Sequence, residues 1–127
     1  MNKEDLKDKI SKASYIVTQE HGTEAPFSGE LLDTKEEGIF TCVCCGNELF
    51  SSDTKYDSGT GWPSFWDVLN ENSVGEEIDK SHGMIRTEVH CQKCGAHLGH
   101  LFPDGPMPTG KRYCMNSVAM QFKKSDK

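Results

Sequence analysis

The distribution of apolar and polar residues divides the chain into a helical N-terminal arm and a longer region of short strands. In the arm, apolar residues recur with the i, i+4, i+7 spacing of one helix face, at Leu6, Ile10 and Ala13. Asn2 is a suitable N-cap and Gly22 a suitable stop signal. The pattern therefore predicts a short helical arm over about residues 2–22, followed by an extended segment.

Beyond the arm, apolar and polar side chains alternate in short runs that are typical of strands. The predicted strands are Gly38–Cys42, Asn47–Phe50, Met84–His90 and Ser117–Phe122. Pro63 is placed to open a short helix that continues to Leu69. Residues 51–61 and 99–110 are rich in turn-forming residues and are expected to be loops. We predict a single, mainly β domain over residues 1–127, with its core over about residues 38–122.

Composition limits both the size of the core and the kinds of partner. Only 35% of the 127 residues are hydrophobic, so the core is thin and needs a further constraint. The sequence shows no apolar run long enough to cross a membrane and no apolar stretch of a signal peptide near its start. With a net charge of −6, it is not expected to bind nucleic acid. We expect a cytoplasmic protein whose six cysteines bind metal or do chemistry.

Four of these cysteines occur in two copies of the pattern Cys-x-x-Cys-Gly, at residues 42–46 and 91–95. The spacing lets both thiolates of a turn face one ion, and the glycine permits the tight turn. The predicted ligands of one zinc ion are Cys42, Cys45, Cys91 and Cys94. Four thiolates leave no open position, which favours a structural metal over a catalytic one. Iron binding or redox use of these thiols is the alternative.

Two cysteines remain outside this pattern, Cys44 and Cys114. Arg112 precedes Cys114 by two residues, which places both side chains on one face of a strand. There the cation is expected to lower the pKa of the thiol. Asn116, two residues further on, can donate and accept hydrogen bonds beside it. On these residues alone, Cys114 is either a nucleophile or a small buried cysteine.

The histidines differ in their settings. His97 and His100 lie three residues apart and are candidates for proton transfer near neutral pH. A structural imidazole or a metal ligand is the alternative for each of them. The other three, His21, His82 and His90, lack a comparable setting and are expected to be structural or at the surface.

Both tryptophans lie in a glycine-rich segment. Trp62 stands between Gly61 and Pro63, and a glycine-rich turn of this kind presents an indole for apolar contact with a small ligand. Phe65 and Trp66 are expected to fill the core instead.

Three longer segments match one known pattern. They are residues 55–65, residues 86–94 and residues 95–117, the last containing Ala-His-Leu-Gly-His-Leu-Phe and Arg-Tyr-Cys-x-Asn-Ser. Together they resemble the type B peptide methionine sulfoxide reductases, the MsrB family, over roughly residues 15–122. The resemblance implies a β-tent of two antiparallel sheets with a structural zinc. It also implies an oxidoreductase that reduces the R epimer of methionine sulfoxide, free or in proteins.

The resemblance further implies roles for individual residues. Cys114 corresponds to the attacking cysteine, Trp62 to the indole that contacts the substrate methyl group, and Arg112 to the arginine beside the nucleophile. The polar residues around the sulfoxide correspond to His97, His100 and Asn116. In this chemistry the thiolate attacks the sulfoxide sulfur, a histidine or a water held by one protonates the oxygen, and the cysteine becomes a sulfenic acid.

One position departs from the family pattern. Thr60 stands where many members have a resolving cysteine. We therefore expect thioredoxin or a small thiol to reduce the sulfenic acid directly, with Cys44 as the alternative resolving thiol. We also expect a monomer with no membrane or nucleic-acid partner.

The alternative function is a zinc module that binds a protein partner without catalysis, because fold alone does not determine function. The residues that discriminate between the two are Trp62, His97, His100, Cys114 and Asn116. A binding module has no need of a nucleophile accompanied by two histidines. A zinc ribbon that binds nucleic acid would need a basic stripe, which the net charge of −6 does not supply.

Overall fold

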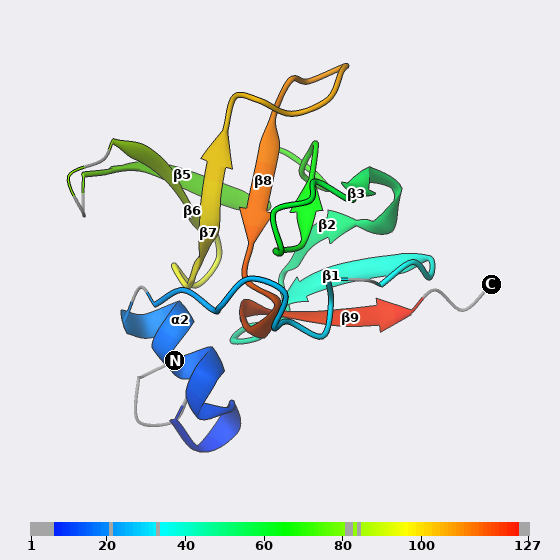
Figure 1. Ribbon diagram of the computed structural model, residues 1–127. Coiled ribbons are helices and arrows are strands. Elements are labelled where there is room, and N and C mark those ends of the chain that lie inside the picture. The colour runs from blue at the N-terminus through cyan, green and yellow to red at the C-terminus, as the bar shows by residue number, and fades with distance from the viewer. Residues whose placement is uncertain (1–6, 21, 33, 81–82, 84, 125–127) are drawn as a thin grey trace.

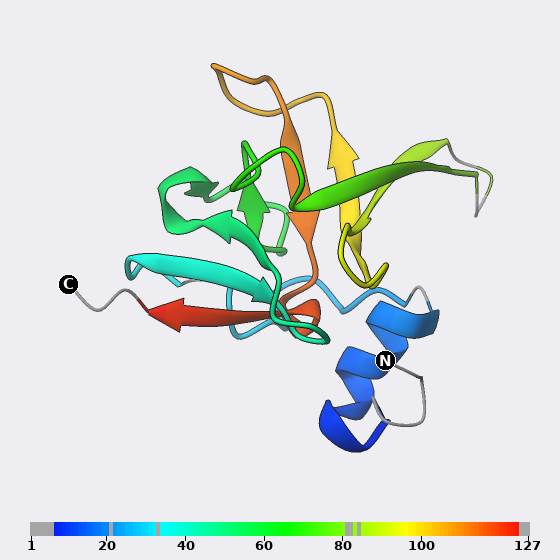
Figure 2. The same cartoon turned by 180° about the vertical axis from the view of Figure 1, so that it is seen from behind.

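The computed structural model describes residues 7–20, 22–32, 34–80, 83 and 85–124. Its strands form two antiparallel sheets (Figure 1). The first has three strands in the order β2 (Glu48–Ser51), β1 (Gly38–Cys42) and β9 (Met120–Lys124). In both views, β1 and β9 run across the direction of the strands that follow (Figures 1 and 2). This arrangement confirms the prediction of a mainly β fold with two antiparallel sheets.

The second sheet has six strands and carries most of the predicted site residues. Its order is β3 (Lys55–Tyr56), β4 (Ser64–Phe65), β8 (Arg112–Met115), β7 (His97–Phe102), β6 (Arg86–Cys91) and β5 (Val74–Asp79). β8 lies between β4 and β7, so the backbone around Cys114 is paired on both sides. Pairing on both sides fixes the register of this strand and hence the direction of each side chain.

Aromatic rings fill the core between the sheets. Phe65 stacks on Phe50 with ring centroids 4.3 Å apart and meets Phe40 edge to face at 5.0 Å. Tyr113 from β8 packs against Phe50 at 5.5 Å. Side chains alternate along β8, so that Tyr113 and Met115 are buried while Arg112 and Cys114 are half-buried on the other face. Packing of the core thereby turns Cys114 away from it.

The helical arm lies within the predicted range but is interrupted, since residues 7–9 are helical and a second helix follows after residue 11. Helix α2 spans Lys12–Glu20, and Ser11 caps it by accepting the amide of Ser14 at 3.1 Å. The expected N-cap, Asn2, lies outside the described residues, as does Leu6. Ala13 is exposed, and the buried residues of the helix are Ser14, Val17 and Thr18. Among the described residues, no helix is long and apolar enough to cross a membrane.

Two sequence predictions of secondary structure are wrong. The helix expected from Pro63 to Leu69 is replaced by strand β4, whose residues pair with both β3 and β8. The strand expected over Ser117–Phe122 begins instead as the short 3-10 helix η3 (Ser117–Ala119), which precedes β9. The chain must change from one sheet to the other between β8 and β9, and η3 makes that change of direction. In both places, tertiary pairing outweighs local preference.

The two predicted loops also contain more regular structure than expected. The first, residues 51–61, includes the 3-10 helix η1 (Ser52–Thr54) and strand β3. The second, residues 99–110, begins inside β7, so the irregular segment starts only at Pro103. β6 begins at Arg86 rather than Met84, which lies outside the described residues, and its partner β5 was not predicted.

Candidate active site and metal centre

The two cysteine turns have the same backbone conformation. In the first, the amide of Gly46 donates to the carbonyl of Cys42 at 2.9 Å; in the second, Gly95 donates to Cys91 at 2.8 Å. Both glycines have φ of +79°, which is the left-handed region that glycine adopts without strain. The glycine that follows each predicted ligand pair is thus explained by the turn itself.

The two turns bring four sulfur atoms into one cluster. The ligand atoms of Cys42, Cys45, Cys91 and Cys94 all lie within 4.8 Å of one another, and the Cys42–Cys94 and Cys45–Cys91 sulfur pairs are 3.6 Å apart. Tetrahedral zinc with Zn–S bonds of about 2.3 Å requires sulfur separations of about 3.8 Å. The residues therefore fit a structural zinc ion, as predicted, with no position left for substrate.

The pKa shifts of the clustered thiols also favour a bound metal ion. Hydrogen bonding to the Cys44 thiol, and then to those of Cys91 and Cys94, raises the pKa of Cys42. Hydrogen bonding from Cys42 lowers the pKa of Cys91. Thiols packed this closely compete for negative charge, and a divalent cation removes the competition because it binds all four as thiolates.

Cys44 lies outside this ligand set. Its buried thiol donates to Thr18 Oγ1 at 3.5 Å and accepts from Gln19 Nε2 at 3.6 Å, so it joins the first turn to helix α2. It lines a groove of about 1150 Å³ that runs past the metal turn, the helical arm and β9. This large groove contains none of the predicted catalytic residues. Cys114 faces a different cavity.

The cavity at Cys114 is smaller, about 100 Å³, and gathers residues from the arm, the glycine-rich loop and three strands of the large sheet. Its lining residues are Thr23, Trp62, Arg86, Gly99, His100, Phe102, Cys114 and Asn116. Four of the six predicted catalytic and substrate-binding residues thus lie in one cavity. The other two each contact a lining residue, His97 packing against His100 and Arg112 against Phe102.

Neighbouring strands hold Cys114 in place. Its register partners are Ser64 on β4 and His100 on β7. Gly99 faces the adjacent peptide of β8, and a Cβ at that position would overlap the carbonyl oxygen of Cys114. The glycine therefore allows β7 to approach β8 closely, which brings His100 directly beside the thiol.

Arg112 lowers the pKa of Cys114 as predicted, but the net shift of that pKa is upward. Burial raises the pKa of the Cys114 thiol above its ordinary value, although the Arg112 charge and hydrogen bonds from Thr60 and Arg112 lower it in part. The nearby carboxylate of Glu24 raises it further. Desolvation opposes the charged form more strongly than one cation supports it. Burial therefore favours the neutral form of the thiol in the free site.

Arg112 is partly neutralised by a residue that sequence reasoning missed. Asp104 accepts from Arg112 Nε at 2.8 Å and from a terminal guanidinium nitrogen at 3.2 Å. This pairing raises the pKa of Arg112 and lowers that of Asp104. The guanidinium also lies 4.3 Å from the ring centroid of Phe102, which lines the cavity. These contacts fix the arginine beside the thiol.

A hydroxyl chain also leads to Cys114. Thr60 Oγ1 is 2.8 Å from Ser58 Oγ, which is 2.7 Å from Ser64 Oγ on β4. Thr60 is the end of the chain that hydrogen-bonds with the Cys114 thiol. The residue found at the expected resolving position thus interacts with the nucleophile as a hydroxyl.

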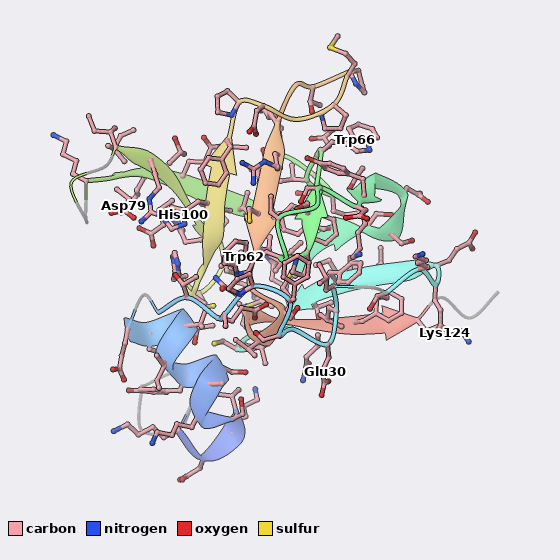
Figure 3. All side chains as sticks on the ribbon, in the orientation of Figure 1. Glu30, Trp62, Trp66, Asp79, His100 and Lys124 are labelled. Carbon is pink, nitrogen blue, oxygen red and sulfur yellow. The ribbon has the colours of Figure 1, made fainter. Side chains whose placement is uncertain are left out.

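Each of the two paired histidines bonds to a carboxylate. His97 Nδ1 is 2.7 Å from Glu88 Oε1, and His100 Nε2 is 2.9 Å from Asp79 Oδ2. The register of β6 and β7 shifts at Val89–His90, and this irregularity brings the rings of His97 and His100 to 5.5 Å in an edge-to-face arrangement. Figure 3 shows Asp79 beside His100. His90 is half-buried, while His21 and His82 lie outside the described residues.

The arm connects Trp62 with Asn116. The indole Nε1 of Trp62 donates to the carbonyl of Glu24 at 3.0 Å, and Asn116 Oδ1 accepts from the amide of the same residue at 2.9 Å. Asn116 also donates through Nδ2 to the carbonyl of Leu98 at 3.0 Å.

The other aromatic residues of the loop have different environments. Phe65 is fully buried, as predicted. Trp66 is only half-buried and stands apart from the site in Figure 3, so its assignment to the core was wrong. The carbonyl of Trp66 accepts from Thr109, which ties its backbone to the loop before β8.

Several residues of the site were not singled out as functional from the sequence. Those that interact with the predicted residues include Glu24, Asp79, Glu88 and Asp104, and Thr60 in its role as a hydroxyl. For Glu88, the only signal in the sequence is its place in the alternating pattern of a predicted strand. Asp79 lies on an unpredicted strand, while Glu24 and Asp104 lie in irregular segments, so no periodic pattern indicated them.

Comparisons with known protein sequences match this chain to one family over nearly its whole length. A model of the SelR domain matches residues 10–124. A peptide methionine sulfoxide reductase MsrB from Hahella chejuensis is 54% identical over 123 residues, covering 97% of this chain and 88% of that protein. One from Methanosarcina barkeri is 55% identical over 122 residues, covering 96% and 86%, and one from Escherichia coli O45:K1 is 55% identical over 119 residues, covering 94% and 87%.

A solved structure shares the fold at much lower identity. The crystal structure of the Mis18 'Yippee-like' domain matches with a TM-score of 0.58 at 19% identity, covering 72% of this chain and 100% of that one. At this identity the likeness concerns the fold alone.

Proposed function

This chain belongs to the SelR domain family, and on that premise we propose that it reduces the R epimer of methionine sulfoxide to methionine with Cys114 as the nucleophile. The observation that carries the proposal is the cavity in which Cys114 meets Trp62, His100 and Asn116. A thiol, an indole, an imidazole and a carboxamide around about 100 Å³ suit a small sulfoxide group with an apolar substituent.

The reaction transfers oxygen from one sulfur to the other. The Cys114 sulfur bonds to the sulfoxide sulfur while the sulfoxide oxygen takes up a proton. The S–O bond of the substrate then breaks, the hydroxyl group bonds to the Cys114 sulfur, and the sulfur–sulfur bond breaks as methionine leaves as a thioether. The methionine sulfur is reduced by two electrons, and Cys114 is oxidised by two electrons to a sulfenic acid. His100 lines the cavity and is the histidine placed to supply a proton, directly or through a water; His97 packs against its ring.

The raised pKa of Cys114 shapes this chemistry. A neutral thiol is a poorer nucleophile than a thiolate, so burial makes loss of the thiol proton a part of the reaction. The thiol proton must leave before attack, and Arg112 and Thr60 then stabilise the thiolate that forms. Protonation of the sulfoxide oxygen and loss of the thiol proton are therefore expected to occur together.

Trp62 is proposed to contact the methyl group of the substrate, while His100 and Asn116 face its oxygen. An R and an S sulfoxide differ by exchanging these two groups around sulfur. A site with an apolar contact on one side and polar contacts on the other therefore binds the two epimers unequally.

Recycling of the enzyme is proposed to need a second protein or a small thiol. Thr60 cannot form a disulfide, and Cys44 lines a different cavity from Cys114. Thioredoxin or a small thiol then attacks the sulfenic acid directly. We further propose that residues 1–127 act as one domain, as a monomer in the cytoplasm, where reducing conditions keep the metal thiolates intact.

The test is turnover of separated R and S epimers, as free amino acid and within a peptide, with dithiothreitol and with thioredoxin as reductant. We expect reduction of the R epimer alone, with either reductant. Reduction of both epimers at similar rates, or of neither, would contradict the proposal.

A further inference from the structure

Glu24 belongs to the irregular segment between α2 and β1, yet it contacts three separate parts of the site. Its amide and carbonyl groups bond to Asn116 and Trp62, as described above, at 2.9 and 3.0 Å. Both of these partners line the cavity at Cys114, as does the preceding residue, Thr23. The backbone of one arm residue, Glu24, therefore joins the Trp62 indole to the Asn116 carboxamide.

The side chain of Glu24 fixes this part of the backbone to η3. Its Oε1 accepts from the amide of Val118 at 3.1 Å, within the short helix η3 that follows Asn116. Its Oε2 is buried, as is the hydroxyl of Ser117, and neither has a hydrogen-bond partner among the described residues. A Cβ on Gly29 would overlap the Ser117 hydroxyl and crowd the same carboxylate oxygen, so the glycine leaves room for both.

The charge of Glu24 also reaches the nucleophile. It is one of the groups that raise the pKa of Cys114, after burial has done so. The residue therefore has two separable properties at this site, a set of hydrogen bonds that fix geometry and a negative charge. Glutamine retains an acceptor oxygen and removes the charge, whereas alanine removes both.

We propose that Glu24 is a positioning residue for sulfoxide reduction, which holds Trp62 and Asn116 at a fixed separation across the cavity by anchoring the arm to η3. The inference rests on the proposed function. The relative placement of the apolar and polar contacts to substrate is then set by a residue that need not touch substrate. Loss of the anchor should weaken substrate binding more than it slows the chemical step.

The experiment compares three variants, Glu24→Ala, Glu24→Gln and the control Glu30→Ala. Glu30 is exposed in the same arm and lies apart from Trp62 and His100 in Figure 3. For Glu24→Ala we expect KM for a methionine sulfoxide peptide to rise about fivefold to tenfold, the usual effect of one lost hydrogen-bonded anchor. The value of kcat should change less than about threefold. Glu24→Gln and Glu30→Ala should keep KM near that of the parent.

A second measurement is independent of activity. In a Trp66→Phe background Trp62 is the only tryptophan, and quenching of its fluorescence by acrylamide reports the exposure of the indole. We expect Glu24→Ala to increase quenching and Glu24→Gln to leave it unchanged. Failure of the proposed function would leave this result intact, because the quenching needs no turnover.

The pH dependence of Cys114 alkylation separates charge from geometry. Removing the Glu24 charge should move the inflection to lower pH in both Glu24→Gln and Glu24→Ala. An unchanged KM and unchanged quenching in folded Glu24→Ala would overturn the proposal. So would a Glu24→Gln variant that matches Glu24→Ala in both. Should Glu24→Ala not fold, Glu24→Asp shortens the anchor by one methylene, and the same two readouts decide.

Discussion

The metal centre and the Cys114 cavity use the same kind of side chain in opposite ways. Four cysteines come from two turns of nearly identical hydrogen bonding, each closed by a glycine at φ of +79°. Cys114 instead depends on an arm, a loop and three strands that are distant in sequence. The metal site is suited to four thiolates, whereas burial disfavours the charged form of the Cys114 thiol.

The difference shows which kind of site can be recognised from a short stretch of sequence. A turn of five residues carries its own geometry, so its pattern can be recognised wherever it occurs. The cavity is defined by strand register and by hydrogen bonds between remote segments, such as that between Glu24 and Asn116, 92 residues apart. Stability should therefore reside mostly in the first site, and activity in the second.

Removing the metal should produce the largest effect. Structural zinc supplies on the order of 10 kcal/mol, comparable with the whole stability of a domain of about 5–15 kcal/mol. We expect Cys42→Ser, or a strong chelator, to abolish the cooperative thermal transition. Cys44→Ser is the matched control and should melt near the parent. A verified metal-free protein with an unchanged Tm would contradict the assignment.

Replacing the nucleophile should have the opposite effect to metal removal, because it should abolish activity and leave stability unchanged. For Cys114→Ser we expect turnover of the R epimer to fall by more than about 10³-fold, while zinc content and Tm stay close to those of the parent. Steady-state rates, metal analysis and a thermal melt on one sample check all three. Residual activity within about tenfold of the parent would remove Cys114 from the proposed mechanism.

The product of Cys114 oxidation tests whether this cysteine reacts independently of the cysteines near the metal. After one equivalent of sulfoxide without reductant, a sulfenate-trapping reagent and mass spectrometry should place an adduct on Cys114. A Cys44–Cys114 disulfide in its place would mean that the two cavities communicate. In a Thr60→Cys variant we expect a disulfide with Cys114 after one turnover, because Thr60 already hydrogen-bonds with that thiol.

Small pH shifts should follow removal of the groups that support the thiolate. Arg112 and Thr60 each lower a pKa that burial has raised, so Arg112→Gln and Thr60→Val should both move the inflection of Cys114 alkylation to higher pH. Below the inflection, the rate rises with pH as thiolate forms. The shift should be larger for Arg112→Gln, since it removes both a charge and a hydrogen bond. A shift to lower pH in either variant would contradict this account.

Much of the fold and part of the site could be predicted from the sequence. Strand Gly38–Cys42, the mainly β character and the four metal ligands follow from short, regular patterns, whereas the two antiparallel sheets were implied by the family resemblance. The expected helix after Pro63 failed because β4 gains partners on both sides, which no local pattern records. The net rise of the Cys114 pKa was missed because spacing gives the neighbour of a thiol but not its burial.

The turn at residues 91–95 is also the hairpin turn between β6 and β7, the strands that carry Glu88 and His97. Hairpins commonly open by fraying at their ends on fast timescales. Fraying from this end would first have to break two metal–thiolate bonds. With zinc bound, the metal turn would therefore resist the opening that separates His97 from Glu88.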